Sequence, residues 1–117
     1  MNPTELVKLA KQAMQRAYVP YSGYKVGAAL LTKGGKVYLG CNIENAAFGP
    51  SNCAERTAFF TAIAAGETEF ESIAVVGGKD GVVTDIFPPC GVCRQVMQEF
   101  CGPDFMIYMG RGDDSYE

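Results

Sequence analysis

The chain has 117 residues, of which 48% are hydrophobic and 20% are charged, and its formal net charge at pH 7 is −3. This length fits one folded domain, which we expect to span residues 1–117, and the composition excludes a disordered chain. The negative charge argues against binding to nucleic-acid backbones, which calls for clustered lysine and arginine. No apolar run reaches the roughly 20 residues that cross a bilayer, and Met1–Glu5 lacks the pattern of a secretory signal. We therefore expect a cytoplasmic protein with neither membrane nor nucleic acid as a partner.

The chain contains five cysteines and no histidine. An odd number of cysteines without an export signal is more typical of metal-binding, catalytic or buried thiols than of a disulfide framework. The absence of imidazole excludes a Ser-His-Asp triad and a Cys-His pair. If a metal is bound, sulfur and carboxylate must hold it.

The first predicted element is a helix. Asn2 is suited to the N-cap, Pro3 to the first helical position and Glu5 to the first turn. Apolar residues then recur at three- and four-residue steps as far as Ala17, and Pro20 ends the pattern. We interpret this segment as a helix that packs on the core.

An aromatic-rich loop follows, with Tyr18, Tyr21 and Tyr24. These side chains are either half-buried anchors or a stacking wall for a flat ring, since tyrosine offers a rigid face with a polar tip. Val26–Thr32 and Val37–Cys41 are apolar runs separated by a Lys-Gly-Gly-Lys turn, which predicts a β-hairpin.

Asn42 and Glu44 leave the second strand of that hairpin. Because they are two residues apart, their side chains point the same way on an extended segment. Together an amide and a carboxylate can bind a pair of hydroxyls; the alternative is a solvated loop in which both residues stabilise turns.

The next helix is predicted from Cys53 to about Ala65, with Ser51 or Asn52 as its cap and Gly66 closing it. It is apolar nearly all round, so it must be covered on most sides, either at the centre of the domain or partly by another subunit.

The second half of the chain predicts a buried strand at Ser72–Val76 and a glycine loop at Gly77–Gly81 without Walker spacing. A short helix follows Cys90, and a further strand spans Phe105–Met109. The order helix, hairpin, helix, strand, helix, strand indicates an α/β fold, a three-layer α-β-α sandwich with a mixed sheet whose C-terminal part is short.

Three thiols are candidate metal ligands, namely Cys53, Cys90 and Cys93. All three lie at predicted helix N-termini. The helix dipole and free N–H groups there favour thiolates, which bind zinc. A structural zinc takes four protein ligands, whereas a catalytic zinc takes three and leaves a position for water. Three cysteines with Glu55 alongside therefore suggest an activated water and a proton carrier.

Arg56 lies three residues after Cys53, on the same helix face. Three thiolates and Zn²⁺ carry a formal charge of −1, which weakens the metal as a Lewis acid. The guanidinium can donate hydrogen bonds to ligand sulfurs and bring the cluster close to neutrality.

The combination of Cys53-x-Glu55 with Pro89-Cys90-x-x-Cys93 matches the zinc-deaminase signature, with cysteine where many members have histidine. With these motifs, and with Gly40–Ala46 and Cys53–Ala58, the chain resembles the small homotetrameric cytidine deaminases. The resemblance implies one Zn²⁺ per subunit held by the three cysteines, with Glu55 moving protons between water, the ring nitrogen and the leaving ammonia.

The same resemblance implies the substrate contacts. The residues concerned are Asn42 and Glu44 on the ribose hydroxyls, the backbone of Ala54 on the pyrimidine, the carbonyl of Pro89 near the amino group, Tyr24 against the base, and Arg56 on ligand sulfurs. Tyr24 stands where relatives usually have phenylalanine. Relatives also continue beyond the last strand with a further strand and an aromatic tail that covers a neighbouring subunit's site.

We accordingly expect hydrolytic deamination of cytidine and 2′-deoxycytidine to uridine and 2′-deoxyuridine, as a step of pyrimidine salvage, by a homotetramer whose partner is a small nucleoside. One alternative is a deaminase of another aminopyrimidine, such as a blasticidin-type antibiotic. Others are a non-catalytic zinc-stabilised interaction module, with Cys41 or Cys101 as the fourth ligand, and a dithiol oxidoreductase.

Overall fold

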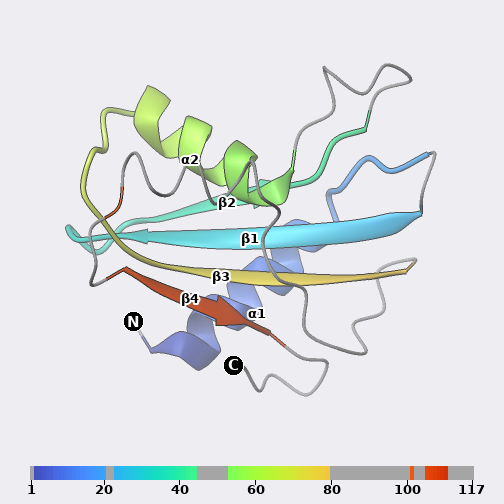
Figure 1. Ribbon diagram of the computed structural model, residues 1–117, viewed down its shortest axis with the longest axis horizontal. Helices are drawn as coiled ribbons and strands as arrows, with labels where there is room; N and C mark the ends of the chain where they lie inside the picture. The colour runs from blue at the N-terminus through green and yellow to red at the C-terminus, as the bar shows by residue number, and fades with distance from the viewer. Residues whose placement is uncertain (1, 21–22, 45–52, 80–100, 102–104, 111–117) are drawn as a thin grey trace.

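The structure, a computed structural model, describes residues 2–20, 23–44, 53–79, 101 and 105–110 (Figure 1). In chain order its elements are α1 (Pro3–Met14), β1 (Tyr24–Thr32), β2 (Val37–Cys41), α2 (Ala54–Ala64), β3 (Phe70–Lys79) and β4 (Met106–Met109). Among the described residues, no helix combines the length and the apolar character that crossing a membrane requires.

The four strands form one mixed sheet in the order β2-β1-β3-β4. β1 lies in the middle and is antiparallel to both β2 and β3, whereas β4 runs parallel to β3. Figure 1 shows α2 in front of this sheet and α1 behind it. The prediction of a helix-covered mixed sheet is therefore confirmed.

Side-chain alternation along β1 explains why both faces need a helix. Ala28 and Leu30 point into the core under α2, while Ala29 and Leu31 point into the core under α1, as the two-residue period of a strand requires. All four side chains are buried. A strand that is apolar on both faces is stable in water only when both faces are covered.

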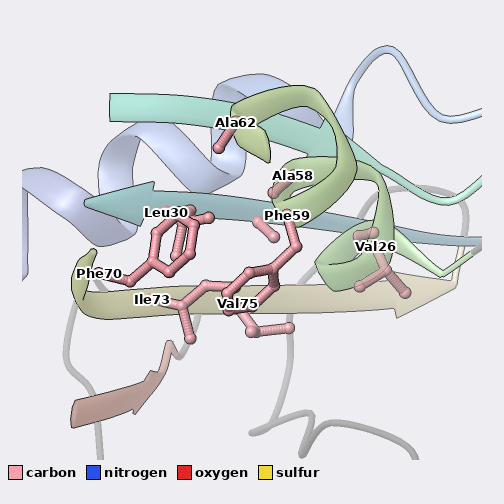
Figure 2. Close-up of a cluster of buried hydrophobic side chains, with 10 residues drawn as sticks. Val26, Leu30, Ala58, Phe59, Ala62, Phe70, Ile73 and Val75 are labelled. Atoms are coloured by element: carbon pink, nitrogen blue, oxygen red, sulfur yellow. The ribbon is translucent and has the colours of Figure 1, made fainter. Parts of the chain in front are cut away.

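The core under α2, called the α2-side core below, is built around Phe59, which is fully buried (Figure 2). Its ring meets that of Phe70 edge-on, with centroids 5.1 Å apart and an interplanar angle of 74°. Phe105 lies just before β4, and its ring centroid is 6.1 Å from that of Phe59. The other buried members are Val26, Ala28, Leu30, Ala54, Ala58, Ala62, Ile73 and Val75.

The first helix begins as predicted but ends earlier. Asn2 is the N-cap, and its side-chain oxygen accepts a hydrogen bond from the Glu5 amide at 2.8 Å. The regular helix ends at Met14 because the next amides turn more tightly: Arg16 N donates to Ala13 O and Ala17 N donates to Met14 O. The helical apolar pattern therefore extends about one turn beyond the helix itself.

Two strands are longer than predicted. β1 starts at Tyr24 rather than Val26, and β3 runs from Phe70 to Lys79 rather than from Ser72 to Val76. The glycines predicted to open a loop remain in the ladder, with Gly77 opposite Val26 and Gly78 opposite Lys25. Pairing with a central strand thus overrides the low strand propensity of glycine.

Three further predictions concern the start of α2, the helix after Cys90 and the last strand. The N-cap of α2 is Cys53, not Ser51 or Asn52, because Cys53 already has extended backbone angles and Thr57 N donates to its carbonyl. The helix predicted after Cys90 lies outside the described residues. The last strand is confirmed as β4.

Gly27 marks a close approach of α1 to the sheet. A Cβ atom at this position would lie 2.1 Å from Ala10 O and 2.4 Å from Met14 N. Both are backbone atoms of the helix, so α1 would have to move away to admit a methyl group.

We therefore expect Gly27→Ala to lower the free energy of unfolding by about 1–3 kcal/mol, the usual cost of overpacking a core, as measured by urea denaturation. Gly34→Ala is the matched control. A Cβ there would lie 3.8 Å from its nearest neighbour, the side-chain oxygen of Thr32, so its unfolding midpoint should stay close to wild type. Equal midpoints for the two variants would contradict the close-approach argument.

Candidate active site

The N-terminus of α2 carries the first predicted metal ligand. Cys53 is the N-cap residue, with φ −80° and ψ 155°, and its side chain makes no capping hydrogen bond. Its sulfur instead accepts a hydrogen bond from Arg56 Nη2 at 3.3 Å. A cation and a helix N-terminus both stabilise anionic sulfur. The site therefore favours the thiolate form of Cys53, which is the form that binds metals.

The backbone of Cys53 is also held by hydrogen bonds. Its carbonyl accepts hydrogen bonds from Thr57 N at 3.0 Å and from Thr57 Oγ1 at 3.1 Å. The side chain of Cys53 also packs against the α2-side core. This cysteine therefore has a fixed position relative to the helix, as a metal ligand needs.

Glu55 lies in the first turn of α2 and is only 1% exposed. Glutamate is almost never this buried unless it is paired or functional. Its burial at the same helix end as Cys53 is consistent with a carboxyl group that exchanges protons within the site rather than with bulk water.

Gly40 determines how deeply this helix end sits on the sheet. A Cβ at this position of β2 would lie 2.3 Å from Ala54 O and 2.5 Å from Ala58 N. The backbone of α2 therefore contacts β2 directly, next to Cys53 and Glu55. Sequence reasoning missed this role of Gly40, although a glycine inside a predicted strand is a known sign of close backbone approach.

The segment that follows α2 is fixed on the same strand. The hydroxyl of Tyr38 donates a hydrogen bond to Glu67 Oε2 at 3.0 Å. Burial, and then the adjacent carboxylate of Glu67, raise the pKa of Tyr38 above its ordinary value. β2 thus contacts both the first turn of α2 and the segment that follows the helix.

The predicted ribose contacts follow β2. Tyr18 N donates to Asn42 O at 3.1 Å, and Glu44 N donates to Tyr18 O at 2.8 Å, around a parallel bridge between Tyr18 and Ile43. The segment that carries Asn42 and Glu44 therefore lies beyond the end of β2, where an isolated bridge and two backbone hydrogen bonds hold it to Tyr18. The side chain of Asn42 also donates to Tyr24 O at 2.9 Å, which brings two predicted substrate contacts together.

Three predicted site residues, Pro89, Cys90 and Cys93, lie outside the described residues. Within the described part of the chain, no three His, Cys, Asp or Glu side chains gather closely enough to hold a metal. The three-cysteine zinc site therefore stays a prediction, of which the structure describes one ligand.

The remaining two cysteines, Cys41 and Cys101, are partly buried. Burial raises the pKa of Cys101 to about 11, and Cys101 packs against the α2-side core. Burial also raises the pKa of Cys41, although nearby Arg16 acts in the opposite direction. Burial thus disfavours the thiolate form at both positions.

The donor set that is described fits zinc. Sulfur is a preferred ligand of Zn²⁺, and an arginine hydrogen-bonded to that sulfur offsets the excess charge that several thiolates bring. The guanidinium of Arg56 is at hydrogen-bond distance from Cys53 Sγ, as the charge argument from the sequence requires.

Comparison with known proteins agrees with the resemblance that the sequence motifs indicate. Residues 1–109 match the family model for the cytidine and deoxycytidylate deaminase zinc-binding region. The chain is 49% identical to a cytidine deaminase of Sporosarcina psychrophila, over 93% of this chain and 77% of that protein. It is 52% identical to a cytidine deaminase of Halalkalibacterium halodurans, over 94% and 80%.

Solved structures with a similar fold are also cytidine deaminases. A crystal structure of cytidine deaminase from Burkholderia pseudomallei superposes with a TM-score of 0.90 at 47% identity, covering 100% of this chain and 91% of that one. Cytidine deaminase from Mycobacterium tuberculosis superposes with a TM-score of 0.82 at 38% identity, covering 92% and 84%.

The contact between Arg56 and Cys53 leads to a test of zinc retention. Arg56→Ala should release zinc to a chelator roughly tenfold more readily than wild type, since lost ligand-supporting hydrogen bonds typically weaken metal binding by 10–100-fold. Metal release is followed with a colorimetric zinc indicator.

Arg16→Ala is the matched control for that experiment. Arg16 is an exposed arginine near Cys41, so its loss should leave zinc release unchanged. Identical release from the two variants would show that the guanidinium of Arg56 does not support the metal site.

Proposed function

The chain belongs to the cytidine and deoxycytidylate deaminase family, and we propose that it deaminates cytidine and 2′-deoxycytidine to uridine and 2′-deoxyuridine by hydrolysis. The observation that carries the proposal is the N-terminus of α2, where Arg56 donates a hydrogen bond to the sulfur of Cys53 and Glu55 is buried alongside. The high identity to cytidine deaminases over most of the chain supports the same substrate class.

Zinc is the cofactor of this reaction. We assign Cys53, Cys90 and Cys93 as its ligands, one ion to each subunit. When bound, zinc supplies the Lewis acid that activates water for attack at C4 of the pyrimidine. The role of Arg56 is to lower the net negative charge of the ligand sulfurs, so that this activation is retained with cysteine rather than histidine ligands.

Glu55 moves the protons of the reaction. It takes a proton from the attacking water, delivers one to N3 of the ring and assists departure of the amino group as ammonia. A group with this role must reach several atoms of the substrate without competition from bulk water. The position of Glu55 in the first turn of α2 and its burial support the assignment.

The nucleoside is bound by groups around that helix end. Asn42 and Glu44 are assigned to the ribose hydroxyls and Tyr24 to the face of the base. The backbone of Ala54 is assigned to the pyrimidine, because the first N–H groups of a helix have no partner within the helix. The carbonyl of Pro89 is assigned to the amino group that leaves.

The same proposal includes the setting of the enzyme: pyrimidine salvage in the cytoplasm by a homotetramer. The outer face of α2 supports the assembly, since Phe60 is 49% exposed on a helix that is otherwise rich in small apolar residues. The net charge of −3 suits a free nucleoside better than a polynucleotide as substrate.

Replacement of the proposed proton carrier gives a direct test of function. Glu55→Gln should retain one zinc per subunit but lose roughly 10²–10⁴-fold in kcat, the usual contribution of general acid–base catalysis. Ammonia release from cytidine and zinc content are measured on the same sample.

Glu69→Gln is the control for charge, because Glu69 is exposed and should keep wild-type turnover. Near-normal turnover by Glu55→Gln would refute the assigned role. Wild-type protein that holds zinc but releases no ammonia from cytidine or 2′-deoxycytidine would refute the proposed reaction.

The assembly has its own test. Phe60→Glu places a carboxylate on the outer face of α2, where burial of an unpaired charge against another subunit is costly. We expect sedimentation velocity to show a tetramer for the wild type and at least tenfold weaker association for the variant. Gln12→Glu adds the same group to an exposed position of α1 and should remain tetrameric; equal association of both variants would contradict the assignment of this face.

A further inference from the structure

Asn42 occupies the point where β2 separates from β1. The regular β1–β2 ladder ends with Gly27 opposite Cys41, so the next residues in register are Val26 and Asn42. In an antiparallel sheet, such a hydrogen-bonded pair exchanges two backbone bonds. One of them is present, from Asn42 N to Val26 O at 3.2 Å.

The second bond of this pair comes from the side chain. Val26 N donates to Asn42 Oδ1 at 2.9 Å, whereas the backbone carbonyl of Asn42 accepts from Tyr18 N at 3.1 Å. The side-chain carbonyl therefore takes the place of the backbone carbonyl in the ladder. As a result, β2 can bond to Tyr18 without leaving the Val26 amide unsatisfied.

The nitrogen of the same side chain binds β1 a second time, because Asn42 Nδ2 donates to Tyr24 O at 2.9 Å. The orientation of the amide is set by its partners: a backbone N–H can only donate and a backbone carbonyl can only accept. Asparagine is thus required here for both of its polar atoms. Aspartate would lack the donor, and alanine would lack both groups.

We propose that Asn42 is a positioning residue of the nucleoside site, whose side-chain amide fixes the start of β1, with Tyr24, relative to the segment that carries Glu44. The significance of this spacing rests on the proposed function, which places Tyr24 on the base and Glu44 on the ribose. The role differs from contact with a ribose hydroxyl, since both polar atoms of the amide are already bonded to β1. A hydroxyl would use the second hydrogen of Nδ2 or the second lone pair of Oδ1, both oriented by these bonds.

The first experiment tests the amide bonds without substrate. Amide hydrogen exchange at Val26 is measured by NMR in ligand-free, zinc-loaded wild type and Asn42→Ala. We expect exchange at Val26 to be roughly fivefold faster or more in the variant, the change that corresponds to loss of one ordinary hydrogen bond. Unchanged exchange at Val26 would overturn the proposal.

Thr32→Val is the matched control, because Thr32 Oγ1 accepts a hydrogen bond from Lys36 N at 3.1 Å at the opposite end of the same hairpin. It should accelerate exchange at Lys36 but not at Val26, and it should retain wild-type kcat/KM. Faster exchange at Val26 in this control would show general loosening of the hairpin, and would overturn the local role of Asn42.

The second experiment separates positioning from direct contact. The kcat/KM of Asn42→Ala is compared with wild type on cytidine and on 2′,3′-dideoxycytidine, which lacks both hydroxyls. Positioning predicts a loss of about tenfold or more on cytidine, of which about threefold or more remains on the dideoxy substrate, because Tyr24 still contacts the base there. If Asn42 only contacted a hydroxyl, the loss would disappear on the dideoxy substrate, and that result would overturn the proposal.

Two provisions keep this comparison decisive. If wild type turns over the dideoxy nucleoside too slowly, its inhibition constant against cytidine replaces kcat/KM. If Asn42→Ala does not fold, Asn42→Asp is used, which keeps an acceptor for Val26 N but loses the donor to Tyr24 O, and the same persistence is expected. Failure of wild type to deaminate cytidine would refute the proposed function, while the exchange experiment would still test the amide bonds.

Discussion

The contact between the backbone of α2 and Gly40 of β2 is the constraint on which the site depends. Helix and strand meet here without a side chain between them, since a Cβ at Gly40 would overlap Ala54 O and Ala58 N. The first turn of α2 is therefore pressed onto the sheet at the residues next to Cys53 and Glu55. A helix held one side chain further away would carry the same groups but place them elsewhere relative to the strand ends.

A similar close contact occurs on the other face of the sheet, where the backbone of α1 packs against Gly27. The middle of the sheet is therefore a thin layer between two closely packed helices, and its small buried side chains, such as Ala28, Ala29 and Ala74, fit this geometry. Tight packing of this kind has low compressibility and allows few alternative arrangements. The fold therefore fixes the first turn of α2, with Cys53 and Glu55, against the sheet.

Charge distribution at the helix end complements this rigidity. The helix dipole and the guanidinium of Arg56 both favour negative charge at Cys53, while burial raises the thiol pKa of Cys41 and Cys101. The five cysteines of this chain are therefore not equivalent. Cys53 lies beside a cation at a helix start, whereas Cys41 and Cys101 are partly buried thiols with raised pKa values.

The sequence by itself determined the helix-covered mixed sheet and the zinc-dependent deaminase family, and it predicted a catalytic role for Cys53-x-Glu55. The reason is that periodicity, capping residues and motif spacing are local properties, and each was strong in this chain: Asn2 caps α1, and Gly66 ends α2 with a φ of 97°. Element boundaries were less accurate where neighbouring strands decided them, as at Gly77 and Gly78, which pairing with β1 keeps in the sheet.

Only the tertiary structure decided the rest. The depth of α2 on Gly40, the pairing of Tyr18 with the segment after β2 and the bonds of the Asn42 side chain to β1 join residues that are distant in the chain. Sequence spacing carries no information about such contacts, because they depend on which backbones meet once both faces of the sheet are covered. The motif could thus be recognised from the sequence, whereas the way in which the fold holds its residues in position could not.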